Sequence, residues 1–338
     1  MKIVVTGGAG FLGAKITKLL ADAGHEVSVF SRNATDNVPE GVTAIDGNLR
    51  KLDAISNAFE NAETVFHVAA KAGIWGKRKD FFGINMYGTR NVITACKLHG
   101  VKNLIYTSTP SVVFGSKALE GADESTPYPT RFLTYYAESK AMAEEEVLNA
   151  SGKGVLKTCA LRPHLIWGNG DPHLVPRVLA RAKAGKLRQV GDGQNEVDIT
   201  HVNDAAYAHI LALQNIEKAA GKAYFISSEK VSLWDWINTL LEKHDLPRIE
   251  KTISRGSAYR IGAIMESIWR ALMLSSEPPM TRFVAENLAT SHWFDTSRAT
   301  KDLGYKPSWT GEKAFEELLG VAVNIAGSRE ATADASAL

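Results

Sequence analysis

The sequence predicts an α/β fold in which a doubly wound parallel sheet is followed by a smaller, mostly helical part. Two observations favour it. In the first half of the 338-residue chain, short β-branched runs alternate with stretches of helical apolar periodicity. After about residue 170 this alternation stops, and prolines, glycines and short helical patterns replace it. Alternation of this length is typical of a parallel sheet covered by helices on both faces.

Each element of the first half has its own pattern. Helical apolar spacing ends at Gly24 after the first helix and at Gly100 after a later one. The expected strands are 3–6, 27–30, 43–45, 64–68, 103–107 and 158–162. The expected helices are 14–23, 52–61, 85–99 and 137–150, and in the second half 174–184, 205–214 and 233–244.

A glycine-rich turn joins the first strand to the first helix. Gly7, Gly10 and Gly13 have the spacing GxxGxxG in the segment GGAGFLG. One glycine allows a tight turn, one lets the backbone approach a pyrophosphate, and one lets helix and strand pack closely. The start of the helix, with Phe11 and Leu12, then presents unpaired N–H groups to the phosphates. This context predicts a dinucleotide site on a Rossmann-type doubly wound parallel sheet.

The end of the second strand bears on the choice of cofactor. An NAD site usually has an acidic residue there for the ribose hydroxyls, but position 31 is Ser. Arg32 follows, and a guanidinium suits a 2′-phosphate, so we expect NADP (NADPH) rather than NAD. The alternative is a solvated surface arginine. Lys15 and Arg50 are weaker candidates for the same phosphate.

Later strand ends complete the predicted cofactor site. Asn48 and Leu49 follow the third strand, where the Asn48 amide could contact adenine. Ala69 and Ala70 follow the fourth strand, where small residues let the cofactor pass close to the backbone. We therefore predict an NADP-binding domain of residues 1–170 plus 198–221, a substrate-binding part of 171–197 and 222–310, and a C-terminal helix and frayed tail of 311–338.

Tyr136 and Lys140 form the predicted proton-transfer pair. Four residues apart on a helix, they lie on one face. A phenol near pKa 10 is a poor acid–base catalyst at pH 7 unless a cation stabilises the phenolate, and lysine does this. The hydroxyl run that starts at Thr107 supplies a third group, for which Thr109 is our choice and Ser108 the alternative.

Composition and charge narrow the class of protein. The net charge of +2 gives no reason to expect a nucleic-acid partner. Cys96 and Cys159 lie in no CxxC pattern, no metal-ligand spacing is present, and we expect reduced thiols, no metal and a cytoplasmic chain. The chain opens directly on a strand, so we expect no signal peptide. No apolar run reaches about 18 residues, so we expect no membrane span.

The motifs together resemble a known family. TGGAGFLG near the start, YTSTPSV at 106–112, YAESK at 136–140 and LRPHLIWG at 161–168 are similar to the extended short-chain dehydrogenase/reductases. The resemblance covers about residues 1–310. It lies in the 3β-hydroxysteroid dehydrogenase-like branch, because sugar epimerases usually carry VYG where this chain has VFG at 113–115.

The resemblance implies roles for individual residues. Thr109 takes the place of the catalytic Ser/Thr, and Asn85 that of the helix asparagine that supports the proton relay. Pro163, Leu165 and Ile166 lie where the nicotinamide amide packs. Two departures matter: Asn48 stands where the superfamily usually has Asp, and Ser31 where NAD-preferring members have Asp. A homodimer through two sheet-flanking helices is also implied.

Longer segments resemble a narrower group, the reductases of bacterial long-chain olefin biosynthesis, whose substrates are 2-alkyl-3-oxo acids. The segments are AAKAGIWG (69–76), IYTSTPSV (105–112), ALRPHLIWGNGDPHLVPR (160–177), GKAYFIS (221–227), AYRIGA (258–263) and the TRF…HW stretch (281–293). The resemblance implies NADPH-dependent reduction of the C3 ketone, with Tyr136 as proton donor, Thr109 hydrogen-bonding the oxygen and Lys140 lowering the pKa of the tyrosine.

A hydrophobic small-molecule substrate implies further candidates. The mostly apolar pattern at 258–274 could shield alkyl chains, touch a membrane surface or a multi-enzyme partner, or be buried ordinarily. The substrate-side candidates are Trp75, Trp167, His164, His173 and Trp293, where either histidine could orient a carboxylate. The rival functions are a 3β-hydroxysteroid or sterol dehydrogenase, a nucleotide-sugar epimerase or dehydratase, and a cofactor-sensing protein without turnover.

Overall fold

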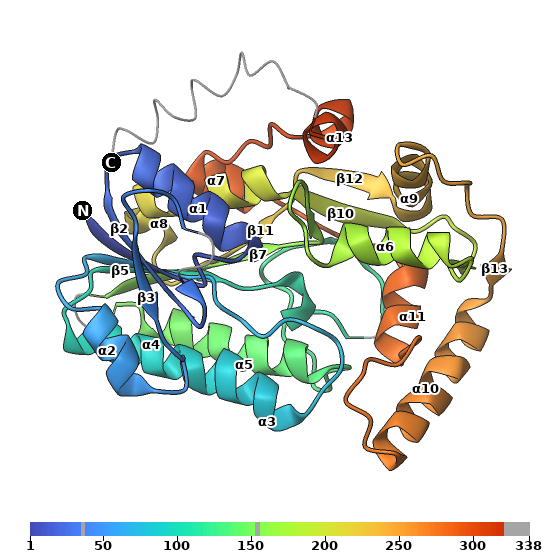
Figure 1. Ribbon diagram of the computed structural model, residues 1–338, viewed down its shortest axis with the longest axis horizontal. Coiled ribbons are helices and arrows are strands. Elements are labelled where there is room, and N and C mark those ends of the chain that lie inside the picture. Colours follow the sequence, from blue (N-terminus) through green and yellow to red (C-terminus); the bar gives the residue numbers. More distant parts are fainter. Residues whose placement is uncertain (35–37, 116, 153–155, 321–338) are drawn as a thin grey trace.

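Figure 1 shows the computed structural model, which describes residues 1–34, 38–115, 117–152 and 156–320. A seven-stranded sheet has the strand order β11-β7-β5-β4-β1-β2-β3, and every neighbouring pair is parallel. The order reverses between β1 and β4, and such a switch point opens a crevice at the carboxyl ends of the strands. The strands are β1 (Lys2–Thr6), β2 (Glu26–Ser31), β3 (Thr43–Asp46), β4 (Thr64–His67), β5 (Asn103–Thr107), β7 (Lys157–Pro163) and β11 (Ala223–Ile226).

Helices cover both faces of this sheet (Figure 1). α1 packs against α7 on one face, and α4 packs against α2 and α5 on the other. Neighbouring strand residues face opposite clusters: Val5 packs with α1 and α7, and Val4 with α2, α4 and α5. This explains why the strands read as unbroken apolar runs. The helices are α1 (Phe11–Asp22), α2 (Leu52–Ala58), α4 (Tyr87–Leu98), α5 (Tyr135–Ala150), α7 (Val202–Gln214), α8 (Ile216–Ala219) and α12 (Ser297–Leu303).

The smaller part has its own sheet and core. Its strand order is β12-β10-β14-β6, with β8 paired to β10, and β13 pairs with β9 apart from it. Trp167, Trp234 and Trp236 lie in the core beneath these strands. The strands are β6 (Leu119–Ala122), β8 (Ile166–Trp167), β9 (Gln189–Val190), β10 (Glu196–His201), β12 (Glu229–Ser232), β13 (Thr252–Ile253) and β14 (His292–Phe294). The helices are α6 (Leu174–Lys183), α9 (Leu233–Glu242), α10 (Arg255–Ala271), α11 (Arg282–Ala289) and α13 (Gly311–Leu318).

The predicted fold class is confirmed, with differences at the boundaries between the parts. β11 pairs with β7 in the large sheet, although residues 222–310 were assigned to the smaller part. β6 and β10 join the smaller sheet, although their residues were assigned mainly to the cofactor domain. Strand pairing joins segments far apart in the chain, so local periodicity does not reveal it. The expected frayed tail lies beyond residue 320, outside the described residues.

The helix expected at 85–99 begins earlier and differently. α3 (Arg78–Phe81) leads into a π-helical turn, η2 (Phe82–Met86), which continues as α4. Such turns inside α-helices are frequent at functional sites, and this one carries Asn85.

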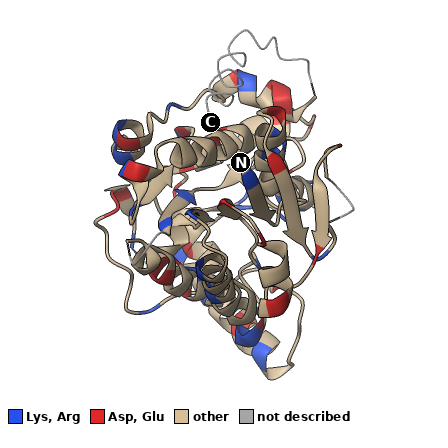
Figure 2. Cartoon of the chain, turned by 90° about the vertical axis from the view of Figure 1, so that its left-hand side faces the viewer, with Lys and Arg blue, Asp and Glu red and all other residues tan. Residues whose placement is uncertain are grey.

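The surface charges also bear on the class of partner. On the side of the molecule seen in Figure 2, acidic and basic residues are interspersed and form no continuous basic face.

Candidate active site

A cleft of about 980 Å³ lies at the carboxyl edge of the large sheet. It gathers the ends of β1, β2, β3, β4, β5 and β7 with the start of α5. Except for Asn85 and the two weaker phosphate candidates, Lys15 and Arg50, it includes the residues predicted to bind the cofactor. These are Gly7, Gly10, Phe11, Leu12, Gly13, Ser31, Arg32, Asn48, Leu49, Ala69, Ala70, Thr107, Tyr136, Lys140, Pro163, Leu165 and Ile166.

The glycine turn forms a cradle that side chains would fill. A Cβ on Gly13 would lie 2.1 Å from the Gly7 carbonyl oxygen, and one on Gly7 would lie 2.8 Å from the Ala69 nitrogen. Gly7 also has a φ of +72°, in the left-handed region. α1 begins after Gly10 without a side-chain cap, so its first N–H groups are available to an anion. These features fit the pyrophosphate of a nicotinamide dinucleotide.

The far end of the cleft carries the candidates for the ribose and adenine. Arg32 is exposed in the turn after β2 and has no hydrogen bond or ion pair with the described residues. The other two cations proposed for the phosphate already form ion pairs. Arg50 pairs with Asp80 at 3.3 Å, and Lys15 pairs with Glu317 at 3.5 Å. Arg32 is therefore the best placed of the three for a 2′-phosphate.

Gly47 and Asn48 line the cleft in the turn that follows β3. Asn48 Oδ1 accepts a hydrogen bond from the Arg50 backbone N–H at 3.0 Å, which leaves the amide nitrogen of its side chain for a ligand. At Gly47 a Cβ would lie 2.1 Å from the Phe30 ring. The turn after β3 therefore requires glycine for a steric reason, which the sequence alone does not reveal.

Tyr136 and Lys140 lie on the first two turns of α5. Thr134 caps this helix by accepting a hydrogen bond from the Ala137 N–H at 3.1 Å. Lys140 is buried, and its Nζ donates to the Thr107 carbonyl oxygen at 2.6 Å and lies 4.0 Å from the centre of the Tyr106 ring. The helix thus holds the phenol and the ammonium in one cleft, as the spacing of the sequence predicts.

Burial changes the proton affinity of both groups. It lowers the pKa of Lys140 to about 7, and the charge of Glu144 acts in the opposite direction. It also raises the pKa of Tyr136, while a hydrogen bond with Thr109 acts to lower it. The structure therefore points to Thr109 as a group that makes the phenol easier to ionise.

Thr109 and Ser108, both just after the end of β5, differ in their hydrogen bonds. Thr109 Oγ1 accepts from the Ser111 N–H at 3.2 Å, which begins the short 3₁₀ helix η3 (Pro110–Val112). Ser108 lines the cleft too, and its buried hydroxyl has no hydrogen-bond partner among the described residues. A buried polar atom left unpaired in a cleft fits a hydrogen bond to a bound molecule.

Asn85 supports the site from behind. Its side-chain amide exchanges two hydrogen bonds with the Lys71 backbone, at 2.7 and 3.0 Å. The same amide donates to Ser139 Oγ at 3.0 Å, and Ser139 donates to the Tyr136 carbonyl oxygen at 2.9 Å. Asn85 thus joins the loop after β4 to α5, the helix of Tyr136 and Lys140, and this position suits the supporting role that the resemblance implies.

A buried chain of side chains, which sequence reasoning missed, connects the glycine turn to Asn85. His67 hydrogen-bonds Thr6 at 2.7 Å and Thr89 at 2.9 Å, and Thr89 donates to the Asn85 carbonyl oxygen at 2.6 Å. Burial lowers the pKa of His67 to about 3, so the ring is neutral. The position of His67 at a strand end suggests proximity to the cleft, but its partners lie 61 and 22 residues away.

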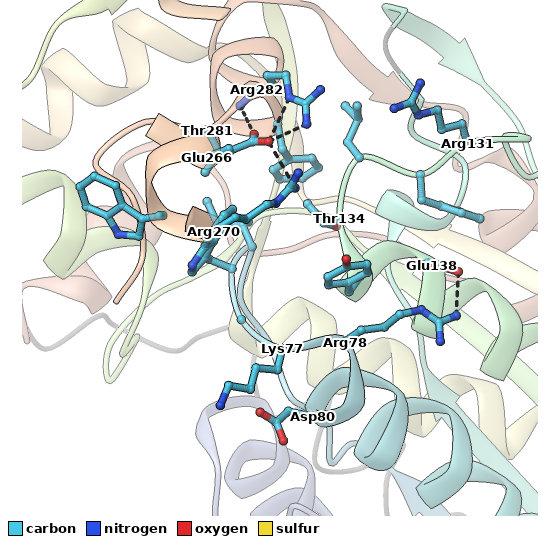
Figure 3. Close-up of a pocket in the computed structure, with 18 of the residues that line it drawn as sticks. Lys77, Arg78, Asp80, Arg131, Thr134, Glu138, Glu266, Arg270, Thr281 and Arg282 are labelled. Carbon is cyan, nitrogen blue, oxygen red and sulfur yellow. Dashed lines mark hydrogen bonds and ion pairs between the residues drawn. The ribbon is translucent and has the colours of Figure 1, made fainter. Parts of the chain in front are cut away.

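A second cavity of about 1420 Å³ opens beside the cofactor cleft, between the loop after β4, α5 and α10 (Figure 3). Aromatic side chains line it, among them Trp75, Tyr259 and Trp269. The Trp75 indole N–H donates to the Leu274 carbonyl oxygen at 3.4 Å and so links the two walls. The cavity borders the cofactor cleft at Lys71, which lines both.

The structure separates the substrate-side candidates. Trp75 lines the second cavity and His173 the cofactor cleft. Trp167 is fully buried in the core of the smaller part. Trp293 lies on β14, and the Lys230 ammonium of β12 lies over its ring. His164 is buried and hydrogen-bonds His292 at 2.7 Å, and burial lowers its pKa well below the usual value. His164 is therefore neutral and does not reach a carboxylate in either cavity.

α10 presents two different faces. Tyr259, Trp269 and, just beyond the helix, Met273 line the second cavity. Ile264 and Leu272 instead lie on the outer face, where they are 61% and 64% exposed. The expectation that this segment shields a substrate therefore applies to its inner face. None of the helices in the described ranges is long and apolar enough to cross a membrane.

Comparisons with known proteins agree with this geometry. The model of the 3-beta hydroxysteroid dehydrogenase/isomerase family matches residues 4–254. The 2-alkyl-3-oxoalkanoate reductase of Stenotrophomonas maltophilia is 46% identical over 329 residues, which cover 94% of this chain and 98% of that protein. The protein of the same name from Shewanella oneidensis is 45% identical over 326 residues, covering 93% and 84%. The mouse sterol-4-alpha-carboxylate 3-dehydrogenase, decarboxylating, is 31% identical over 323 residues, covering 93% and 89%.

Solved structures are similar over nearly the whole chain. The crystal structure of gox2253 has a TM-score of 0.76 and 26% identity and covers 94% of this chain and 97% of its own. MoeE5 in complex with UDP-glucose and NAD has a TM-score of 0.73 and 24% identity, with coverage of 95% and 98%. The second likeness concerns the fold alone.

Proposed function

Because the chain belongs to the 3-beta hydroxysteroid dehydrogenase/isomerase family and is an NAD(P)-dependent oxidoreductase, we propose that it reduces 2-alkyl-3-oxoalkanoates to 2-alkyl-3-hydroxyalkanoates. The step would belong to long-chain olefin biosynthesis. The observation that carries the proposal is the match to two reductases of that name, at 45% and 46% identity over at least 93% of this chain.

The side chains of the cleft suit this reduction. When bound, a nicotinamide dinucleotide supplies the hydride. Tyr136 donates its proton to the oxygen that develops negative charge on C3. Thr109 hydrogen-bonds the same oxygen, and the Lys140 cation favours the tyrosinate that remains. The Thr107 carbonyl oxygen holds Lys140 in position, 2.6 Å from Nζ.

The second cavity supports an apolar substrate. Trp75, Tyr259 and Trp269 offer apolar surface to alkyl chains on one side of a volume of about 1420 Å³, while charged side chains such as Arg131 and Arg282 line the rest. It meets the cofactor cleft at Lys71, so the reacting carbon can face the cofactor site while the alkyl chains extend into the second cavity. Trp269 would contact these chains from α10, and Met273 from the turn just beyond it.

NADP(H) is the proposed cofactor. Arg32 lies in the cofactor cleft without an acidic partner among the described residues, and position 31 carries no acidic group to repel a 2′-phosphate. A guanidinium binds phosphate oxygens with charge-assisted hydrogen bonds. NAD is the less favoured alternative.

A sterol or hydroxysteroid dehydrogenase is the second candidate, because the family and the aromatic cavity also suit a sterol. A nucleotide-sugar epimerase is less well supported. Phe114 stands where epimerases usually have the tyrosine of VYG, and it packs edge-on against Phe283 and His292. That buried position offers no hydroxyl to a sugar.

The first experiment is an absorbance assay at 340 nm with the purified protein. A 2-alkyl-3-hydroxyalkanoate and a 3β-hydroxysteroid are each tested with NADP⁺ and NAD⁺, beside the Tyr136→Phe variant. We expect turnover of the hydroxy acid with NADP⁺ and its loss in the variant. Turnover of the steroid alone would keep the mechanism and move the function to the second candidate. No turnover of either would refute the proposed function.

A further inference from the structure

The chemistry of a 2-alkyl-3-oxo acid places its charge close to the reacting atom. The carboxylate carbon and the ketone carbon are both bonded to C2. Bonds of about 1.5 Å therefore keep the carboxylate oxygens within roughly 5 Å of the C3 oxygen. A side chain that binds this carboxylate must border the place where Tyr136 and Thr109 meet the substrate.

Lys71 has this location. It follows Ala69 and Ala70, after the end of β4. Among the described residues, it is the one that lines both the cofactor cleft and the second cavity. Its Nζ lies 5.2 Å from the centre of the buried Phe81 ring, and it has no ion pair with a described acidic residue. An unpaired ammonium over an apolar ring lies in an environment that strengthens attraction to an anion.

The other cations around the two cavities are ion-paired, held by the backbone, or line only one of the two cavities. Arg270 and Arg282 both pair with Glu266, at 3.5 and 2.6 Å, as Figure 3 shows for the wall opposite Lys77. Arg78 pairs with Glu138 at 3.2 Å. Four more cations are exposed, and they line the second cavity but not the cofactor cleft: Lys77, Lys79, Lys117 and Arg131. Lys140 is buried against the Thr107 carbonyl, and Arg32 lies at the far end of the cleft.

The backbone of Lys71 is fixed independently of its side chain. Asn85 holds both the N–H and the carbonyl of Lys71, at 2.7 and 3.0 Å. The ammonium is therefore carried by a loop that is tied to the catalytic helix through Ser139. A change of the side chain leaves this clamp in place, so its effect on substrate binding can be measured separately.

We propose that the Lys71 ammonium binds the substrate carboxylate and makes the enzyme selective for 3-oxo and 3-hydroxy acids over uncharged ketones and alcohols. This inference rests on the proposed function and extends it to the group that recognises the acid. The ion pair fixes the C1 end of the substrate, so C3 faces Tyr136 while the alkyl chains enter the second cavity.

The test compares a 2-alkyl-3-hydroxyalkanoate with its methyl ester, which lacks the charge. In Lys71→Met we expect KM for the acid to rise by roughly 10- to 100-fold, as for loss of a charge-assisted hydrogen bond, with KM for the ester changed less than about twofold. Lys71→Arg should recover most of the discrimination. Lys77→Met, which removes a cation of the outer rim, should leave the ratio of the two KM values unchanged.

A binding measurement makes the result independent of turnover. Quenching of tryptophan fluorescence, to which Trp75 and Trp269 of the second cavity contribute, reports binding of a 2-alkyl fatty acid and of its methyl ester. We expect Lys71→Met to weaken binding of the acid and to leave binding of the ester unchanged. An equal effect on acid and ester, or no effect on either, would overturn the role of Lys71 even if the wild-type protein is an active reductase. Acid-selective binding that depends on Lys71 without turnover would instead refute the proposed reaction alone.

Discussion

Asn85 Nδ2 donates a hydrogen bond to Ser139 Oγ across 3.0 Å, between residues 54 positions apart, and so ties the π-helical turn η2 to α5, the helix of Tyr136 and Lys140. Ser139 passes the connection to the Tyr136 carbonyl oxygen. Asn85 lines neither cavity, yet it holds the loop that carries Lys71. The position of Tyr136 relative to the loop that carries Lys71 therefore depends on one buried amide.

Asn85→Ala should lower both stability and activity. The change leaves the Lys71 N–H and carbonyl without their partners, which should destabilise the fold by about 1–3 kcal/mol. Displacement of the loop and of Tyr136 should reduce kcat by roughly 10- to 100-fold. Urea unfolding and steady-state kinetics measure the two effects.

Asn103→Ala is the matched control, because Asn103 donates one hydrogen bond to Thr64 Oγ1 at the opposite end of the strands. It should leave kcat unchanged. A wild-type kcat in the Asn85 variant would show that the amide does not position the catalytic helix.

Arg32→Ala should weaken NADPH binding selectively. Loss of charge-assisted hydrogen bonds to a 2′-phosphate should raise KM for NADPH by roughly 10- to 100-fold and change KM for NADH by less than about twofold. The variant Lys51→Ala, which removes an exposed cation outside the cleft, should change neither value. Equal KM changes for the two cofactors would count against a phosphate contact at Arg32.

Reductase activity should fall as pH rises above about 7. Burial lowers the pKa of Lys140 to about 7, so the cation is present below this value and is lost as pH rises through it. A neutral Lys140 no longer favours the tyrosinate that forms when Tyr136 gives up its proton. Lys140→Arg, which keeps its charge, should move the decline in kcat/KM to higher pH. A flat wild-type profile from pH 6 to 9 would contradict this role.

The same shift has a consequence for stability. In the unfolded chain lysine keeps its proton up to about pH 10.4, so between about 7 and 10.4 the unfolded state binds more protons than the folded state. The contribution of Lys140 to stability therefore increases with pH across this window. Denaturant titrations of wild type and Lys140→Met at pH 7 and 9 should differ accordingly, with a smaller gain for the variant.

Removal of Glu144 should destabilise the fold strongly. Its carboxylate accepts hydrogen bonds from Arg162 Nε at 3.0 Å and from the Tyr128 hydroxyl at 2.7 Å, and the side chains of the ion pair are 0% and 4% exposed. Glu144→Ala leaves the Arg162 charge buried without its partner, at a cost of about 3–5 kcal/mol. The exposed pair of Lys18 and Asp22 is the control, since Asp22→Asn should cost less than about 1 kcal/mol. If urea unfolding showed similar losses of unfolding free energy for Glu144→Ala and Asp22→Asn, the buried ion pair would not be the stabilising feature proposed here.

Local patterns made much of this architecture predictable. The strand–helix order follows from apolar periodicity, and the distances between the glycines and between Tyr136 and Lys140 follow from turn and helix geometry. These features depend on neighbours within a few residues. The predicted tryptophan and histidine contacts succeeded less well, since Trp167 and His164 lie in the interior and residue type alone does not indicate which cavity a side chain faces.

The fold class, the glycine cradle and the spacing of Tyr136 and Lys140 can all be predicted from the sequence, because each depends on residues close together in the chain. Three further relationships are visible only in the folded protein: β11 completes the large sheet, His67 links Thr6 to Thr89, and Lys71 lies where the two cavities meet. These relationships join elements that are distant in the chain. They arise when the helices and sheets pack together, and that packing depends on many side chains at once.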